Sequence, residues 1–155
     1  MKGPERVAAA LAEHGIRARV QSLPESTRTS HEAARVVGCD VAQIAKSVVF
    51  RGAESGEAVL VVASGANRVS AEKVAGHVGE PVEMGDAAFV REASGYAIGG
   101  VPPLGHRTPL RTLLDEDLFA HSTVWAAGGG SRELFALDPR ELERATGAPR
   151  ADVRE

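Results

Sequence analysis

KSVVFRGAESGEAVLVVAS, residues 46–64, is the stretch of sequence that decides the fold. It contains two valine-rich runs, residues 46–52 and 58–64, with the turn-rich sequence GAESGE where they meet. Two apolar runs joined by a short turn-rich segment predict a pair of neighbouring strands. The second run is apolar on both faces, which is typical of a central strand that is covered on both sides. The stretch therefore predicts the centre of a β-sheet.

Two helices have well-marked ends in the sequence. The first is predicted at residues 29–38, where Thr29 as N-cap and Glu32 three residues later form a capping box. The last is predicted at residues 138–147, which contain the same kind of box and a proline in the first helical turn. Each segment ends at a glycine, the residue that most commonly ends a helix. Both patterns favour short helices beside the sheet.

The remaining sequence alternates irregularly between helix-like and strand-like segments. This irregularity, with hairpin-like strand pairs, favours an α/β (mixed α+β) domain over a purely parallel one. We predict a single compact domain over residues 1–155, with a mixed central sheet, flanking short helices and a loose tail at residues 148–155. Further helices are predicted at residues 4–15, 70–79 and 86–95, and further strands at residues 17–22, 110–115, 122–128 and 132–137.

The charge balance limits the kind of partner that the protein can bind. Eighteen basic and 21 acidic side chains give a formal net charge of -3. Proteins that clamp a long duplex usually present a strongly basic surface, so we expect at most a local contact with nucleic acid. No apolar run approaches the roughly 20 residues that span a bilayer, and the N-terminus does not resemble a signal peptide. We expect a cytoplasmic protein with no membrane partner.

Residue types that bind metals or attack substrates covalently are sparse. Cys39 is the only cysteine, which excludes an internal disulfide and a thiolate metal cluster. The five histidines show no metal-ligand spacing, and neither a GxSxG motif nor a Walker loop is present. The sequence therefore predicts no metal site, no cofactor and no activated protein nucleophile.

Lys46 stands out because only three of the 18 basic residues are lysines. Alternate residues of a strand share a face, so Lys46 groups with Val48 and Phe50 on the more apolar side of the first valine-rich run. Two interpretations remain open. The stem of Lys46 can lie on the edge of the core with its ammonium group in water. Alternatively, the ammonium group faces a cleft and holds an anionic or carbonyl-bearing ligand.

SGYAIGGVPPLGHRTP, residues 94–109, predicts a loop, because its glycines and prolines exclude a regular helix or strand. Glycine lets a ligand approach the backbone, and exposed amides can then donate hydrogen bonds. A long constrained loop in a small domain favours a functional role over a simple connection. His106 ends this loop and is the histidine that we associate with it. Gly128 and Gly129 lie in a second glycine turn, a weaker candidate for an anion-binding nest.

Together these segments resemble the YbaK-type aminoacyl-tRNA editing domain family, which includes the free-standing prolyl-tRNA editing proteins. The resemblance covers nearly the whole chain in order. In the family pattern a lysine opens the strand and a G-x-x-x-P loop borders the same pocket, which places Lys46, Gly99 and Pro103 at that pocket. The segments that carry the resemblance are TRTSHEAARVVG, QIAKSVVF, VLVVASGANRVS, SGYAIGGVPPLGH, LLDEDLF, WAAGGGSREL and LDPRELERATGA.

The resemblance implies a trans-editing hydrolase that deacylates mischarged aminoacyl-tRNA. It implies tRNA for proline carrying a small wrong amino acid such as cysteine or alanine, with the tRNA acceptor end as partner and prolyl-tRNA synthetase as a possible second partner. The alternative is a non-catalytic module of the same fold that binds a tRNA end, a nucleotide or a protein. Leu134 departs from family members that have a polar or acidic residue in this strand. We expect Lys46 to be the catalytic residue and the following residues to bind substrate: Gly99, Gly100, Pro103, His106, Gly128 and Gly129.

Overall fold

The two valine-rich runs form the antiparallel pair at the centre of the sheet. The computed structural model describes residues 2–155, and in it β2 (Ile44–Gly52) pairs with β3 (Ala58–Ser64) along nearly the whole length of both strands. Residues Val59 to Ser64 of β3 are all buried. This confirms a central strand that is covered on both faces, as its continuous apolar pattern predicts.

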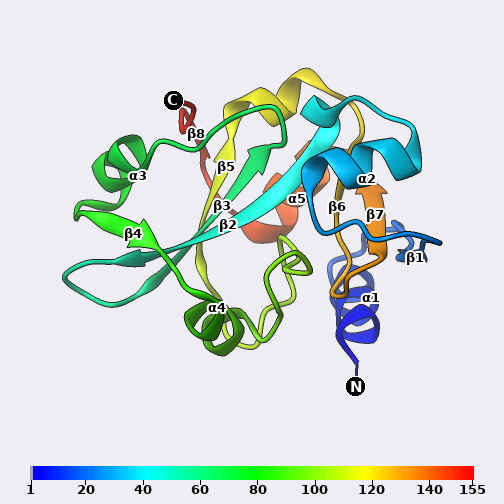
Figure 1. Ribbon diagram of the computed structural model, residues 1–155, viewed down its shortest axis with the longest axis horizontal. Coiled ribbons are helices and arrows are strands. Elements are labelled where there is room, and N and C mark those ends of the chain that lie inside the picture. Colours follow the sequence, from blue (N-terminus) through cyan, green and yellow to red (C-terminus); the bar gives the residue numbers. More distant parts are fainter. Residues whose placement is uncertain (1) are drawn as a thin grey trace.

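The sheet is mixed, as the irregular order of predicted elements indicates. Seven of its eight strands follow the order β1-β7-β6-β2-β3-β5-β8, and the eighth, β4, pairs with β2 outside this order (Figure 1). The pairs β2–β6, β3–β5 and β5–β8 are parallel, whereas β2–β3, β2–β4, β6–β7 and β1–β7 are antiparallel. The remaining strands are β1 (Gln21–Ser22), β4 (Val82–Met84), β5 (Arg111–Asp115), β6 (Val124–Ala127), β7 (Glu133–Leu137) and β8 (Arg150–Ala151).

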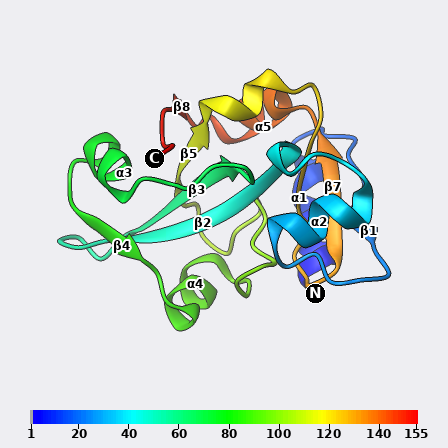
Figure 2. The ribbon, with the colours of Figure 1, turned by 45° about the horizontal axis from the view of Figure 1, so that its top comes forward.

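The edge of β2 that faces away from β3 is divided between two other strands. Strand β6 pairs with Ile44 and Ala45, and β4 pairs with residues 50–52. Figure 2 shows β2 crossing the molecule with β4 near one end and α2 near the other. No strand of residues 2–155 pairs with the middle of β2 on this edge. The result is a short interruption in the sheet.

The helices begin and end where the sequence predicts. Both capping boxes form: the Thr29 side chain accepts from the backbone N–H of Glu32, and Asp138 and Glu141 make the corresponding pair. The glycine after each of these helices adopts the left-handed conformation that ends a helix. The helices are α1 (Gly3–Glu13), α2 (Ser30–Val37), α3 (Ala71–Val78), α4 (Ala87–Ser94) and α5 (Pro139–Thr146), with the 3₁₀ helices η1 (Val41–Gln43) and η2 (Glu116–Ala120).

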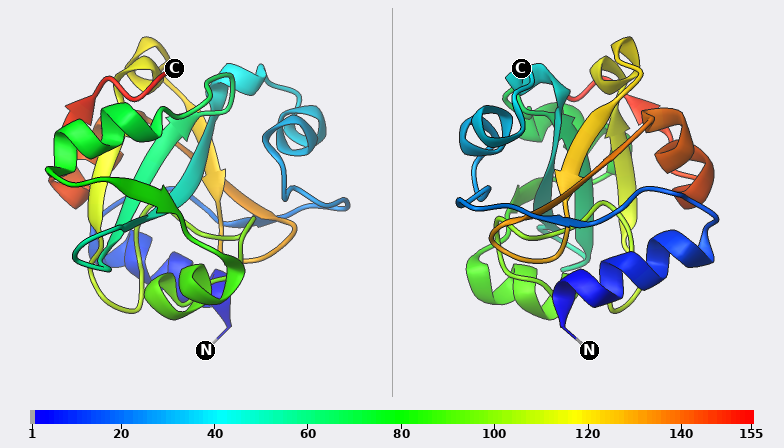
Figure 3. Two further views of the ribbon diagram at one scale, coloured as in Figure 1. Left: turned by 60° about the vertical axis from the view of Figure 1, so that its left-hand side comes forward. Right: turned by 90° about the vertical axis from the view of Figure 1, so that its right-hand side faces the viewer.

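Buried apolar side chains form three clusters around the sheet. The largest contains residues of α1, α4 and α5, including Val7, Leu11 and Leu142. A second lies under α3, and a third joins α2 to β2 and β7. Figure 3 shows α1 at the end of the molecule where β6 turns into β7, and the backbones of Gly3 and Gly129 lie in contact there. The helices thus cover the sheet on both faces.

The predicted loose tail at residues 148–155 is wrong. Strand β8 lies in this segment and pairs in parallel with β5, and Val153 is fully buried in the cluster under α3. The backbone N–H of Ser70 donates to the carbonyl of Val153 at 2.7 Å. The segment is rich in charged residues, which is why its sequence resembles a tail. Its alternate apolar residues, Ala151 and Val153, are buried in the core. The predicted strand at residues 17–22 is limited to β1, and the short strand β4 was not predicted.

Candidate active site

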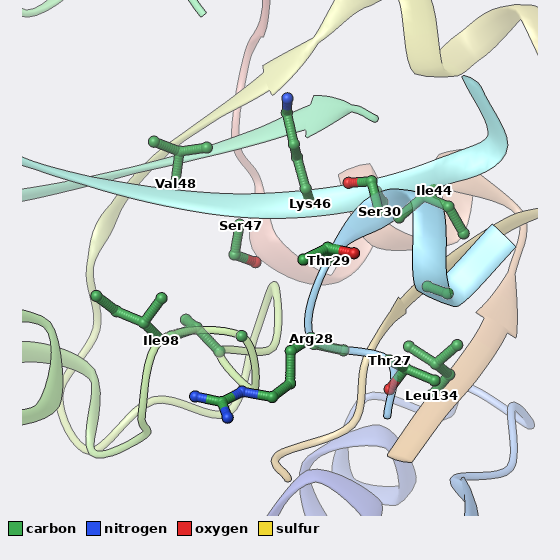
Figure 4. Close-up of a pocket in the computed structure, with 15 residues that line it drawn as sticks. Thr27, Arg28, Thr29, Ser30, Ile44, Lys46, Ser47, Val48, Ile98 and Leu134 are labelled. Atoms are coloured by element: carbon green, nitrogen blue, oxygen red, sulfur yellow. The ribbon is translucent and has the colours of Figure 1, made fainter. Parts of the chain in front are cut away.

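A cavity of about 270 Å³ lies beside the interrupted edge of β2. Most of its lining comes from three segments: the first half of β2, residues 27–30 at the start of α2, and residues 98–101 of the glycine- and proline-rich loop (Figure 4). Single residues of α2, β6 and β7 complete it. Its apolar side includes Ala33, Ile44 and Leu134. Its polar side includes the hydroxyl-bearing residues Thr27, Thr29, Ser30 and Ser47. The lining residues are Thr27, Arg28, Thr29, Ser30, Ala33, Ile44, Ala45, Lys46, Ser47, Val48, Ile98, Gly99, Val101, Ala127 and Leu134.

The capping box of α2 fixes one wall of the cavity. The backbone N–H of Thr29 donates to Glu32 at 3.2 Å, and the Glu32 N–H donates to the Thr29 hydroxyl at 3.1 Å. One turn before the helix, the N–H of Thr27 donates to the carbonyl of Ser131 at 2.9 Å. Residues 27–29 are therefore held between α2 and the turn that precedes β7.

The loop that forms the opposite wall is held by its own polar side chains. The Tyr96 ring is buried, and its hydroxyl donates to the carbonyl of Gly105 at 2.8 Å. His106 forms a 2.7 Å hydrogen bond from its ring Nε2 to the carbonyl of Pro102. Burial lowers the pKa of His106, an effect partly opposed by this hydrogen bond, and so favours the neutral ring. The first bond joins the beginning of the loop to its end, and the second joins its end to its middle, so the loop is braced by its own side chains.

Gly99 lies at the point where the two walls meet. Its φ is +90°, a conformation that side-chain-bearing residues rarely adopt, and a Cβ placed there would be 3.2 Å from the Cβ of Arg28. The guanidinium group of Arg28 is exposed and reaches toward Ile98 (Figure 4). Ile98 is itself 53% exposed, an unusual state for a large apolar side chain. Arg28 and Ile98 therefore form an open rim on this side of the cavity.

Lys46 lines the cavity, but its ammonium group is turned to the other side of β2. Figure 4 shows its side chain rising from the strand on the side opposite to Ser47. The ammonium Nζ donates to the carbonyl of Asn67 at 2.5 Å. Burial lowers the pKa of Lys46, and the carboxylate of Asp115 opposes that effect. The structure thus gives Lys46 a partly buried ammonium group with a specific backbone acceptor.

The buried carboxylate of Asp115 organises the segment that holds Lys46. Asp115 is 1% exposed, and its oxygens accept from the backbone N–H groups of Ser64 at 3.0 Å and Asp117 at 2.9 Å. The side-chain amide of Asn67 donates to Asp115 at 2.8 Å and to Asp117 at 2.9 Å. Because Asn67 also supplies the carbonyl for Lys46, Asp115 positions the ammonium group through Asn67.

Ser47 points toward the cavity side of the strand. Its hydroxyl oxygen is buried and has no hydrogen-bond partner in the structure. A buried polar atom without a partner is unfavourable, at a cost of about 1–3 kcal/mol. Figure 4 shows this side chain directed toward Arg28 and Ile98. Ser47 thus carries a buried hydroxyl group without a partner on this side of the strand.

The structure brings together some of the residues that the sequence singled out and separates others. Lys46 and Gly99 line one cavity. The other predicted substrate-binding residues are not among the lining residues, and their direct contact with a substrate stays a prediction. Gly100 is buried and its N–H donates to the carbonyl of Ala97 at 2.9 Å. Pro103 is buried, and His106 bonds to the loop backbone.

Gly128 and Gly129 form the turn between β6 and β7 and do not line the cavity. The N–H of Gly128 donates to the carbonyl of Glu133 at 2.8 Å. A Cβ on Gly129 would lie 2.6 Å from the backbone of Gly3. Gly129 therefore allows α1 to approach the turn closely, whereas a Cβ on Gly128 would meet Val20 and Glu133. Within residues 2–155 no group of three or more His, Cys, Asp or Glu side chains is placed to hold a metal ion.

The sequence alone did not single out Arg28 or Ser47 as site residues. Arg28 is one of many arginines, and nothing in the local pattern distinguishes it. Ser47 could have been found, because the period of two places it on the face opposite to Lys46. That face borders the cavity.

No helix among the described residues is long and apolar enough to cross a bilayer.

Comparisons with known proteins agree with this architecture. Residues 24–145 match the aminoacyl-tRNA editing domain family. The protein YwhH of Bacillus subtilis (strain 168), which is uncharacterized, is 33% identical over 123 residues, which cover 79% of this chain and 78% of YwhH.

Solved structures of similar proteins share the whole fold. A proposed trans-editing enzyme for prolyl tRNA synthetase is 49% identical, with a TM-score of 0.93 over 100% of this chain and 98% of the other. The hypothetical protein APE2540 is 32% identical, with a TM-score of 0.91 over 97% of this chain and 99% of the other. With the family match over residues 24–145, these similarities establish that the chain belongs to the aminoacyl-tRNA editing domain family.

Proposed function

We propose that the protein is a trans-editing deacylase that hydrolyses the ester of a mischarged aminoacyl-tRNA. The proposed substrate is tRNA for proline carrying a small wrong amino acid, alanine or cysteine. The observation that carries the proposal is that Lys46 and Gly99, which the family pattern assigns to one pocket, line one cavity. The similar structure described as a trans-editing enzyme for prolyl tRNA synthetase supports the choice of proline tRNA.

The ester bond is reactive enough for a water molecule to be the nucleophile. Such a site must place the water and stabilise the negative charge that develops on the carbonyl oxygen. A hydroxyl group of the terminal ribose can assist, since it lies next to the ester in the substrate itself. This chemistry agrees with a cavity whose polar groups are hydroxyl groups, backbone groups and the guanidinium group of Arg28 on the rim, with the Lys46 ammonium group on the other side of β2.

The two cations fit different parts of the tRNA end. Arg28 lies exposed on the rim, where a guanidinium group can pair with a phosphate or stack on a base. Lys46 has a flexible stem, and its ammonium group makes one hydrogen bond to Asn67, a kind of bond that contributes about 1.5–3 kcal/mol net when the donor is charged. A terminal phosphate can therefore compete for the Lys46 ammonium group and position the ester over the cavity.

Selection against larger amino acids follows from the volume and polarity of the cavity. Leu134 is 2% exposed and packs with Ile44 and Ala33, so this wall is apolar. One methylene group changes discrimination by about 1–3 kcal/mol in such a pocket. An apolar wall also favours alanine over a more polar side chain.

The net charge of -3 favours a loose complex with tRNA. Prolyl-tRNA synthetase, as a partner in the cytoplasm, can assist the binding of the tRNA.

A panel of mischarged tRNAs tests this function directly. Loss of the ester is followed with alanyl- and cysteinyl-tRNA for proline, and correctly charged prolyl-tRNA is the control. We expect hydrolysis of the small mischarged substrates and sparing of prolyl-tRNA. Saturable binding of the charged tRNA without any ester loss would favour the alternative, a non-catalytic module that binds the tRNA end.

A further inference from the structure

The interrupted edge of β2 presents backbone groups that no strand satisfies. On this edge β6 ends its pairing at Ala45, and β4 begins its pairing at Phe50. The N–H of Gly85 reaches the carbonyl of Val49 at 3.0 Å. Within residues 2–155 no strand pairs with Ser47 on this side. The peptide groups of Ser47 therefore lie at the centre of the interruption.

The register of β2 with β3 shows which way these groups point. In an antiparallel pair, alternate residues exchange hydrogen bonds with the partner strand, and the residues between them point their N–H and C=O groups outward. The N–H of Gly65 donates to Ile44, and the N–H of Gly52 donates to Glu57, so the even-numbered residues of β2 face β3. The N–H and C=O groups of Ser47 therefore point into the interruption.

The space beside Ser47 can hold a ligand. Ser47 and Val48 line the main cavity and also a neighbouring hollow of about 100 Å³, which is bounded by Gly85 and Val90. Ile98 and Val101 border both spaces. The buried hydroxyl oxygen of Ser47 has no partner at the same place. The outward peptide edge of Ser47 thus lies beside both spaces, with the buried orphan hydroxyl group next to it.

We propose that the peptide edge of Ser47 is the recognition slot for the α-aminoacyl group, an inference that rests on the proposed deacylase function. The Ser47 carbonyl accepts from the α-ammonium group of the substrate, and the Ser47 N–H donates to the ester carbonyl oxygen. The substrate takes the place of one strand residue between β6 and β4. The substrate class is then an α-aminoacyl ester with a free amino group.

The chemistry of an aminoacyl group matches this edge. A residue that pairs with one strand residue needs one donor and one acceptor, which an aminoacyl ester supplies through its α-ammonium group and its carbonyl. Hydrogen bonds from a charged donor are shorter and stronger than neutral ones. The Ser47 N–H would also stabilise charge on the carbonyl oxygen as water attacks. The slot therefore contributes to binding and to the chemical step.

Substrate analogues test the acceptor half of the slot without changing the protein. Alanyl-tRNA is compared with the same tRNA carrying a propionyl ester, which lacks only the α-amino group. We expect kcat/KM to fall by about 10- to 100-fold for the propionyl ester, the range for a lost hydrogen bond to a charged group. Equal rates for the two esters would overturn the slot while leaving the deacylase function intact.

The variant Ser47→Pro tests the donor half, because proline lacks an N–H. Proline is tolerated in a strand where its nitrogen faces an unpaired edge, so the fold is expected to survive. Ser47→Ala, which keeps the N–H and loses the hydroxyl, is the matched control. We expect Ser47→Pro to lose at least tenfold more kcat/KM than Ser47→Ala. Equal activity of the two variants would exclude the N–H as a donor.

A binding measurement separates the slot from turnover. An alanyl-adenosine analogue with an amide in place of the ester is titrated into the wild-type protein while backbone amide NMR signals are followed. We expect the Ser47 amide signal to shift with this analogue and to shift much less with the propionyl version. Binding that shifts other signals and leaves the Ser47 amide unchanged would overturn the slot. This result is independent of whether the protein hydrolyses any ester.

Discussion

The ammonium group of Lys46 donates to the backbone carbonyl of Asn67, while the adjacent residue Ser47 points to the opposite side of the strand. The side chains of two neighbouring residues thus lie on opposite sides of β2. Lys46 carries the charge near the Asn67 turn, and Ser47 carries the free polar groups near the cavity.

Replacing Lys46 by methionine removes the charge and keeps the length of the stem. We expect deacylation of alanyl-tRNA to fall by about 10- to 100-fold, the loss typical of one electrostatic contact to a substrate. Thermal unfolding should change little, since the stem still packs. The control is Lys73→Met, because Lys73 makes an exposed ion pair with Asp152 outside the cavity. Unchanged activity of Lys46→Met would remove Lys46 from the proposed role.

Replacing Asp115 by asparagine should destabilise the fold and disturb Lys46. An amide NH₂ would face N–H donors that the carboxylate now accepts, which costs about 2–3 kcal/mol of unfolding free energy. Urea unfolding measures this loss. Asp117→Asn is the control and should cost less, since Asp117 is partly exposed. Equal effects of the two substitutions would contradict the positioning role of Asp115.

Alanine at Gly99 should weaken both stability and activity. The left-handed φ of +90° and the contact with Arg28 oppose a Cβ, with an expected cost of about 1–2 kcal/mol. The matched control is Gly76→Ala in α3, where a Cβ meets nothing within 4 Å and helix propensity favours alanine. We expect the control to be neutral or stabilising. Thermal unfolding and alanyl-tRNA deacylation, measured on both variants, check this prediction.

Stability should fall on acidification because of His106. Burial depresses the folded-state pKa of this ring below its ordinary value of 6.5, so the unfolded state binds the proton first. The contribution of His106 is therefore complete above about pH 6.5 and is lost as the pH falls toward the lower folded-state pKa. The difference in melting temperature between wild type and His106→Gln, measured from pH 7.5 to 5.5, should shrink with falling pH. A constant difference would exclude this linkage.

Truncating Val153 to alanine tests whether the packing of the C-terminal segment contributes to the stability of the fold. Val153 is fully buried, so the loss of its methyl groups should cost about 2 kcal/mol of unfolding free energy. Glu155→Ala, a substitution at an exposed neighbouring position, should leave the stability unchanged. If the two variants melted together, residues 148–155 would behave as the loose tail that their sequence suggests.

The sequence predicts elements that depend on neighbouring residues and misses those that depend on distant partners. The capping boxes at Thr29 and Asp138 require only contacts within one helical turn, and both are confirmed. Strand β8 is two residues long and exists because β5 offers it an edge, which no local pattern reveals. From its sequence alone, the short charged segment at residues 148–155 is therefore predicted to be a tail, because its pairing with β5 cannot be seen there.

The same limit applies to the candidate site. The family pattern indicates Lys46 and Gly99, and both line the cavity. It does not indicate that the ammonium group bonds to Asn67, because that contact depends on the turn held by Asp115. The interruption of the β2 edge is also invisible in the sequence, since it arises from where β4 and β6 stop pairing.

The outermost strands of the sheet are very short, β1 at Gln21–Ser22 and β8 at Arg150–Ala151. A long, flat edge strand can recruit the edge of another molecule and start aggregation, whereas a two-residue strand offers too few free groups to do so. The gap at Ser47 is equally short. An interruption of this length can admit a small ligand but offers too few free backbone groups to pair with a strand of another molecule.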